Sequence, residues 1–223
     1  MGAERGTCTL AEYLAEHGRM PLGEGLAMLD ELLRIVGEGH RQGVTDGALV
    51  PERIILAASG AVSVAAPGER AAGAARVEAA PTDADAALAD AASFLSPQQR
   101  DGKDADPRAD VYALGVIAYR ALTGSMPYAA GAEEPTDPAT YLPSLVDHVE
   151  RSLLIAVQRN LTERFGDALT FRAALRGDSD LALASPTLKW AVPEGIPEGD
   201  TGAAEEFAGE ETPSDSEVPL LPE

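Results

Sequence analysis

Apolar side chains in the first part of the chain recur with the period of an α-helix. In residues 20–43 they are spaced alternately by four and three, which places one set on a single helix face: Leu22, Leu26, Leu29, Leu33, Val36 and His40. A shorter helix over residues 8–18 precedes it, because Thr9 and Glu12 have the spacing of a capping box and Gly18 suits a helix end. Because His40 shares the apolar face, we interpret it as a structural histidine rather than as a ligand or a base.

The period then changes to that of strands. Residues 53–68 predict a β-hairpin, with two apolar runs joined by a Ser-Gly turn. Residues 69–93 are alanine-rich and weakly patterned, and we expect a long loop there. A third helix starts at Asp110, is apolar nearly all round and therefore buried, and ends at Gly124. Two more helices complete the pattern, over residues 142–160 and 164–177.

The C-terminal segment has a different composition. Residues 186–223 carry ten acidic side chains against the single Lys189, with many prolines and glycines. Such a segment buries too little apolar surface to offset the entropy lost on ordering, so we predict a disordered acidic tail over residues 179–223. Four hydroxyl side chains lie among its acidic residues and are candidate phosphorylation sites, although a purely solubilising tail is the simpler interpretation: Thr201, Thr212, Ser214 and Ser216.

Composition excludes several classes of function. The net charge of -20 over 223 residues argues against binding to nucleic acid and to anionic membranes, since both require clustered Lys and Arg. The single cysteine, Cys8, excludes an intramolecular disulfide and every multi-cysteine metal site. No apolar run approaches the length of a membrane span, and no signal peptide is visible. These features indicate a cytoplasmic protein without a metal site.

Four stretches of the chain carry motifs in a defined order. They read "TLAEYLAEHGRM" at 9–20, "HRQGV" through "LVPERIIL" at 40–56, "FLSPQQRDGKDADPRADVYALGVIAYRALTGSMPY" at 94–128, and "ERF" at 163–165 followed by "FRAAL". Together they resemble the C-terminal lobe of bacterial Ser/Thr protein kinases over residues 9 to about 176. The resemblance implies a mainly α fold, a kinase-like helical bundle with one small β-hairpin between two long helices. It gives three parts: an N-terminal extension (1–8), the lobe (9–178) and the acidic tail (179–223).

The working positions of such a kinase carry other residues here. Kinases use an Asp beside the substrate hydroxyl, a Lys beside the transferred phosphate, and an Asn and an Asp that hold Mg²⁺. With the loop anchored on Pro51-Glu52, these four positions fall on Ala48, Val50, Arg53 and Ala66. Of the Asp-Phe-Gly motif only Gly68 remains. The resemblance therefore implies a pseudokinase, with no catalytic residue, no cofactor and no bound metal.

Asp46 is an alternative candidate for the base. It lies five residues before Pro51, whereas the family spacing is three, so a two-residue insertion in a tight loop would be required. A turn formed by Asp46 and Gly47 is the preferred interpretation.

Three further positions have structural roles by resemblance. Asp110 falls on a buried aspartate that hydrogen-bonds the catalytic-loop backbone, and a plain N-cap is its alternative role. Arg164 falls on an arginine that pairs with a glutamate, which here is Gln98. The resemblance thus implies that an ion pair is reduced to a hydrogen bond with a neutral acceptor, which would loosen this side of the lobe.

Eight residues precede Thr9, so we expect no N-terminal lobe and an apolar face left open by its absence. This face would consist of Leu49, Val50, Ile54, Val62 and Val64. Exposed apolar patches usually mark interaction sites, and we expect another protein or a second copy of the chain to bind there. The leading hypothesis is an inactive kinase-like scaffold or regulatory module in bacterial Ser/Thr kinase signalling. The alternatives are the C-terminal lobe of a split kinase completed by another chain, and a non-functional fragment.

Overall fold

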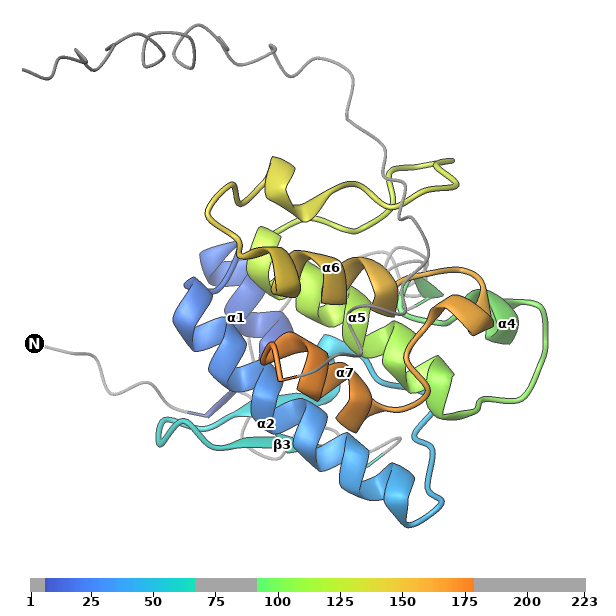
Figure 1. Cartoon of the computed structure of the whole chain (residues 1–223). Coiled ribbons are helices and arrows are strands. Elements are labelled where there is room, and N and C mark those ends of the chain that lie inside the picture. Colours follow the sequence, from blue (N-terminus) through green and yellow to red (C-terminus); the bar gives the residue numbers. More distant parts are fainter. Residues whose placement is uncertain (1–6, 67–91, 179–223) are drawn as a thin grey trace, which may run out of the picture. The chain divides into compact units, whose positions relative to one another are not determined.

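The computed structural model describes residues 7–66 and 92–178. This part of the chain is mainly helical, with one small antiparallel sheet (Figure 1), as the sequence predicts. In chain order its elements are β1 (Cys8–Thr9), α1 (Leu10–His17), α2 (Leu22–Arg41), η1 (Pro51–Arg53), β2 (Ile54–Leu56), β3 (Val62–Val64), α4 (Pro97–Arg100), α5 (Pro107–Thr123), η2 (Pro138–Thr140), α6 (Asp147–Ala156), η3 (Leu161–Glu163) and α7 (Ala168–Leu175).

The first two helices have the predicted positions. Thr9 caps α1 through a complete capping box with Glu12, and Gly18 ends the helix at a φ of 77°. The buried positions of α2 include Leu29, Leu33 and Val36, which belong to the predicted apolar face. Local hydrogen bonding and the apolar period therefore agree in this part of the chain.

Three helix starts differ from the prediction. The N-cap of α5 is Asp106, which accepts from the Arg108 N–H, so Asp110 lies inside the first turn and the N-cap role was wrong for it. Helix α6 begins at Asp147 rather than at residue 142, because residues 141–146 form turns around Pro143. Helix α7 begins at Ala168 rather than at residue 164, with Asp167 as its N-cap. The three residues before 164 form the short helix η3.

The sheet contains one strand more than the predicted hairpin. Its order is β1-β2-β3, with Thr9 opposite Ile55, Ile54 opposite Val64 and Leu56 opposite Val62. Cys8 also pairs with β2, so the sheet includes one residue of the predicted N-terminal extension. A strand of two residues is too short to show the period of a strand in the sequence.

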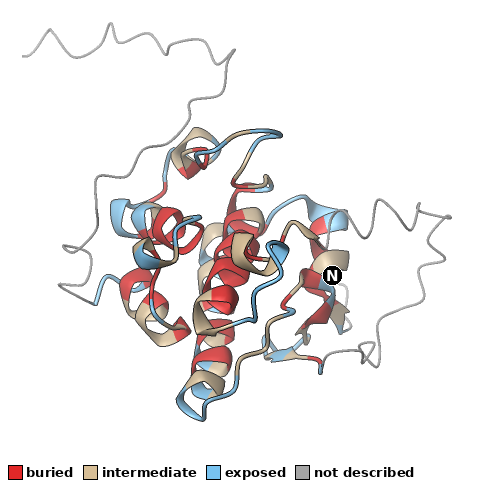
Figure 2. Cartoon of the chain, turned by 90° about the vertical axis from the view of Figure 1, so that its right-hand side faces the viewer, coloured by how far each residue is buried: buried red, intermediate tan, exposed pale blue. Residues whose placement is uncertain are grey.

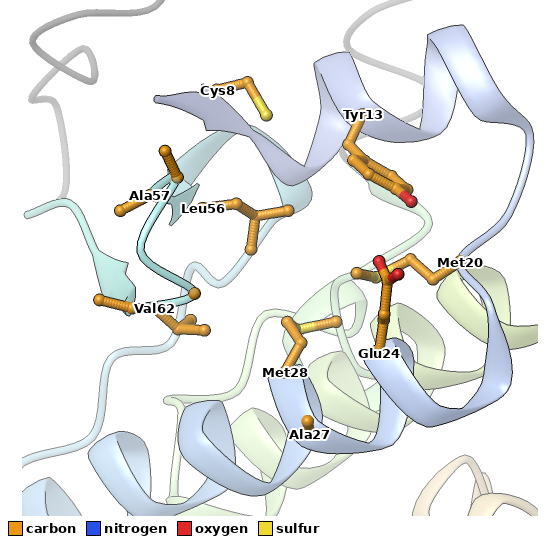
Figure 3. A pocket seen from close by; sticks show the side chains of 12 residues that line it. Cys8, Tyr13, Met20, Glu24, Ala27, Met28, Leu56, Ala57 and Val62 are labelled. Atoms are coloured by element: carbon orange, nitrogen blue, oxygen red, sulfur yellow. The ribbon is translucent and has the colours of Figure 1, made fainter. Parts of the chain in front are cut away.

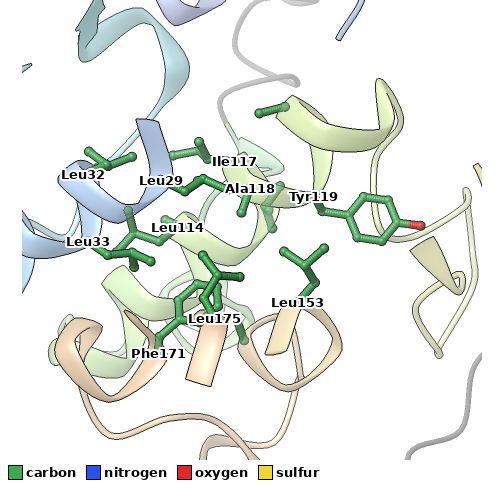
Figure 4. Packing of buried hydrophobic residues seen from close by; sticks show 14 of the residues in the cluster. Leu29, Leu32, Leu33, Leu114, Ile117, Ala118, Tyr119, Leu153, Phe171 and Leu175 are labelled. Atoms are coloured by element: carbon green, nitrogen blue, oxygen red, sulfur yellow. The ribbon is translucent and has the colours of Figure 1, made fainter. Parts of the chain in front are cut away.

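Helix α5 forms the centre of the core. Fourteen of its residues are buried, and α2, α6 and α7 pack against it (Figure 4). Buried positions lie where the helices pack together, and exposed ones lie in turns and on the solvent side of the helices (Figure 2). Gly115 of α5 allows the close approach of α6, since a Cβ there would lie 2.7 Å from that of Ala156. Tight helix contacts of this kind fix the positions of the loops that the helices support.

Several predictions fall outside the described residues. They are the long loop over 69–93 in all but its last residues, Gly68, the acidic tail and the four candidate phosphorylation sites. Within the residues that are described, no helix is both long enough and apolar enough to cross a membrane.

Candidate functional site

The loop between α2 and β2 meets the end of β3 at a small hollow of about 240 Å³. Asp46 and Arg53 line it from the loop, Ala65 and Ala66 from the segment after β3, and Asp110 from α5. The candidate site is therefore defined by residues 46–53, 65–66 and 110, and we call it the loop site. Its members are the positions at which the family resemblance places kinase chemistry.

Arg53 connects the two sides of the loop site. Its side chain is buried, and its Nε and Nη2 donate to the Ala65 carbonyl oxygen at 2.9 and 2.6 Å. Nη1 donates to the Ala48 carbonyl oxygen at 2.7 Å, and Nη2 to Asp46 Oδ2 at 2.7 Å. Because Nη1 also donates to Asp46 Oδ1, the guanidinium and the carboxylate form a two-point pair. The guanidinium thus joins the loop to the end of β3.

Asp46 is fully engaged by these contacts. Oδ1 accepts a third hydrogen bond, from the Ala48 N–H at 3.1 Å, in the manner of an Asx turn. The turn interpretation of Asp46 and Gly47 therefore agrees with the geometry, and Gly47 has a φ of 70° that favours glycine. Both carboxylate oxygens of Asp46 therefore accept hydrogen bonds within the loop site.

Asp110 of α5 binds the backbone of the loop. Its carboxylate is completely buried and accepts from the Asp46 N–H at 2.8 Å and from the Gly47 N–H at 2.7 Å. This is the contact that the resemblance implies for this position. Asp110 Oδ2 also lies 3.0 Å from His40 Nε2.

His40 is a hydrogen-bonded structural residue in this network. Its Nδ1 accepts from the Ala168 N–H at 3.2 Å, so that nitrogen carries no proton. Nε2 must then donate to the Asp110 carboxylate, which fixes the tautomer. The end of α2, the loop site and the start of α7 are joined by these two residues.

Arg164 and Gln98 make the neutral contact that the resemblance implies. Arg164 Nη2 donates to Gln98 Oε1 at 2.7 Å, and Gln98 Nε2 donates to the Arg159 carbonyl oxygen at 2.7 Å. Arg164 also donates to the carbonyl oxygens of Gln158, Arg108 and Arg159. Burial lowers the pKa of Arg164 to about 10, and the charges of Tyr112, Tyr128 and Asp106 offset this only in part.

The remaining working positions are small and apolar. Ala48 and Ala66 are exposed and Val50 is half-buried.

Two groups that bind residues of the loop site had no signal in the sequence. They are the Ala65 carbonyl oxygen, which is the main acceptor for Arg53, and Gln99, whose Nε2 donates to the Gly47 carbonyl oxygen at 2.7 Å. Backbone acceptors cannot be found from residue types, because every residue has one.

The predicted open apolar face is wrong for two of its five residues. Leu49 and Ile54 are 1% and 0% exposed and belong to the core, and Val50, Val62 and Val64 are partly buried against it. The register gives the reason. Residues opposite each other in an antiparallel pair share a face, so Ile54, Leu56, Val62 and Val64 all lie on the helix side of the sheet, and Ile55 and Ser63 lie on the outer side.

A pocket of about 450 Å³ separates part of the hairpin from the helices (Figure 3). Leu56 and Val62 of the hairpin line it together with Tyr13, Met20 and Met28. The pocket is therefore a gap under the sheet rather than part of the loop site. In the part of the chain that the structure describes, no group of three metal-ligating side chains is present.

Comparison with known proteins identifies homologues. Serine/threonine-protein kinase PknL of Mycobacterium tuberculosis is 32% identical over 197 residues, which cover 83% of this chain and 48% of PknL. PknA of the same species is 30% identical over 207 residues, which cover 86% of this chain and 46% of PknA. The chain thus spans about half the length of these relatives. No protein-family model matches it.

The fold agrees with this homology. The crystal structure of the PknI kinase domain from Mycobacterium tuberculosis superposes with a TM-score of 0.57 at 22% identity, covering 78% of this chain and 62% of that domain. By sequence and by fold, the chain is homologous to the mycobacterial serine/threonine protein kinases, over about half the length of PknL and PknA.

Proposed function

We propose that the chain is a non-catalytic kinase-like lobe that acts as a scaffold or regulatory module in bacterial Ser/Thr kinase signalling. The observation that supports this most is the position of the Arg53 guanidinium. By the family resemblance, residue 53 is where a kinase has the Asn that holds Mg²⁺. Here a buried cation stands at that position and bonds to Asp46, Ala48 and Ala65.

The physical consequence concerns charge. A guanidinium beside the loop repels a divalent cation, and it already occupies the Asp46 carboxylate, the nearest oxygen ligand for a metal. Arg53 also makes a connection between the loop and the end of β3 that needs no metal. The loop site therefore keeps its conformation without Mg²⁺, and its side chains offer no base.

Metal binding tests the proposal directly. Mn²⁺, a paramagnetic substitute for Mg²⁺, is titrated into the full chain, and line broadening of the backbone amide signals of residues 46–53 is followed by NMR. We expect no selective broadening in the wild type. The double substitution of Arg53→Asn with Ala66→Asp is expected to produce it, because it supplies two oxygen ligands and removes the cation.

Selective broadening in the wild type would contradict the proposal and favour the split-kinase alternative. In that case Mg²⁺-ATP should also raise the melting temperature of the wild-type chain when the completing chain is present. If Arg53→Asn with Ala66→Asp unfolds the protein, Arg53→Gln keeps the comparison, since it removes the cation and its hydrogen bonds without adding a carboxylate.

The proposal also includes a binding partner, which would contact a different surface from the one predicted from the sequence. Another protein, or a second copy of this chain, would contact the outer side of the sheet, where Ile55 and Ser63 lie. Light scattering of the purified chain and affinity purification from the native cell test this. A strict monomer that retains no protein would contradict it, and Ile55→Asp identifies the surface if a complex is found.

A further inference from the structure

A second polar pocket lies where α4, the start of α5 and the segment after α6 meet the loop that follows α5. It has a volume of about 470 Å³. Arg100, Tyr112, Tyr128 and Arg159 line it, together with the small residues 129–132. We call it the arginine pocket. Its size lies within the usual range for ligand sites, about 300–1,000 Å³.

Two guanidinium groups face this pocket. Arg159 lies over the Tyr128 ring, with its Cζ 4.7 Å from the ring centroid, and donates to the Ala132 carbonyl oxygen at 2.5 Å. Arg100 is exposed, and its Nη2 lies a long 3.4 Å from the Tyr112 hydroxyl. Since a guanidinium has five N–H donors, both arginines keep donors for a ligand.

A third arginine lies beneath them. Arg164 is buried with its Cζ 4.9 Å from the Tyr112 ring centroid, and its bonds go to Gln98 and to backbone carbonyl oxygens. Burial raises the pKa of the Tyr112 hydroxyl, while the charges of Arg100, Arg164 and Arg159 oppose this. All three arginines are thus close enough to influence the pKa of the same hydroxyl group, that of Tyr112.

Within the described residues, the three arginines make no ion pairs. Across residues 7–66 and 92–178, no carboxylate lies within 4.0 Å of the guanidinium nitrogens of Arg100, Arg159 or Arg164. Gln98 supplies a neutral oxygen where a glutamate would have supplied a charge. Glu133, which is exposed, is the one carboxylate among the described residues that line the pocket.

We propose that the arginine pocket binds a phosphate monoester, presented as a phosphoserine or phosphothreonine side chain of a partner protein. Guanidinium groups bind phosphate through paired N–H donors, and a phosphate dianion needs more than one cation. The small side chains of residues 129–132 leave room for the phosphate and its side chain. A single anionic group is compatible with the net charge of -20, because charges beyond about 8 Å are screened at physiological salt.

This inference goes beyond the proposed function and does not depend on it. It rests on α4, α5 and the segment after α6, whereas the non-catalytic proposal rests on Arg53 and the loop site. The two experiments have separate readouts, so either proposal can fail alone.

The test is a titration of the full chain with the pentapeptide Ala-Ala-phosphoserine-Ala-Ala, followed through the Nε–H NMR signals of the arginines. We expect saturable shifts for Arg100 and Arg159. The same peptide with Glu in place of phosphoserine should bind at least about tenfold more weakly, which corresponds to about 1.4 kcal/mol. Equal binding of the Glu peptide would overturn the assignment to phosphate. Inorganic phosphate that binds as tightly as the phosphopeptide would overturn the assignment to a protein side chain.

Substitutions locate the site. Arg100→Gln and Arg159→Gln should each weaken binding about tenfold or more, whereas the exposed Arg41→Gln on α2 should leave it unchanged. Gln98→Glu should weaken binding severalfold, because its carboxylate would pair with Arg164 and reduce the positive charge beside the pocket. The urea midpoint of each variant is measured beside its affinity, which separates loss of binding from loss of folding. Unchanged affinity in Arg100→Gln and Arg159→Gln would refute the proposal.

Discussion

Replacing Asp110 with asparagine keeps the size of the side chain and removes its charge. The wild-type carboxylate is 0% exposed and accepts from the Asp46 N–H, the Gly47 N–H and His40 Nε2. In the best arrangement, the asparagine oxygen takes the place of Oδ2 and accepts from the Asp46 N–H and His40 Nε2. The side-chain NH₂ group of the asparagine then faces the Gly47 N–H. One buried donor loses its acceptor, at a cost of about 1–3 kcal/mol. The other two bonds lose their charge assistance, which about halves their strength.

The free energy of unfolding should therefore fall by about 3–5 kcal/mol in Asp110→Asn. At about 2–4 °C for each kcal/mol in a chain of this size, the melting temperature should fall by roughly 10 °C. Urea unfolding followed by far-ultraviolet circular dichroism measures the loss. Asp101→Asn is the matched control, since Asp101 is exposed and its change should stay within about 0.5 kcal/mol. A loss below about 1 kcal/mol in Asp110→Asn would refute the view that this carboxylate holds the loop.

Two further measurements test the packing and the electrostatics of the lobe. Gly37→Ala should destabilise the protein by about 1–3 kcal/mol, because the new Cβ would lie 2.5 Å from Leu169 Cγ. Gly23→Ala, whose Cβ would have nothing within 4 Å, should stabilise α2 by up to about 1 kcal/mol. Equal effects of the two substitutions on urea unfolding would contradict the predicted contact with Leu169. Burial raises the pKa of Tyr128 to about 12, so the unfolded chain loses that proton first and stability should fall as the pH rises from about 10 towards 12. Tyr128→Phe should reduce this fall in urea unfolding between pH 9 and about 11, and an unchanged fall would show that other groups cause it.

The sequence predicts most of the fold because the local signals and the packing agree. The capping box at Thr9 and the apolar face of α2 both gave helices with the observed ends. The prediction for α6 began too early because an amphipathic pattern continues through Leu142 and Leu145, although Pro143 and the turns beside it prevent a helix there.

The sequence predicted which residues form the candidate site better than it predicted which atoms they contact. The resemblance placed Asp110 under the loop and paired Arg164 with Gln98, which are long-range contacts that one sequence alone cannot give. The sequence showed Arg53 as a cation in the place of a metal ligand, but not that its main partner is the Ala65 carbonyl oxygen. Ile54, Val62 and Val64 do share one face of the sheet, as predicted, but the sequence did not show that this face packs on the helices.

The support of the loop by Asp110 and His40 has a consequence for protein engineering. Asp110 of α5 binds the N–H groups of Asp46 and Gly47 rather than loop side chains, and His40 of α2 holds the Asp110 carboxylate. The exposed side chain of Ala48 takes no part in them. The loop is therefore a preformed scaffold position, where a chosen side chain or a short peptide can be grafted at residue 48 and displayed in a known backbone conformation.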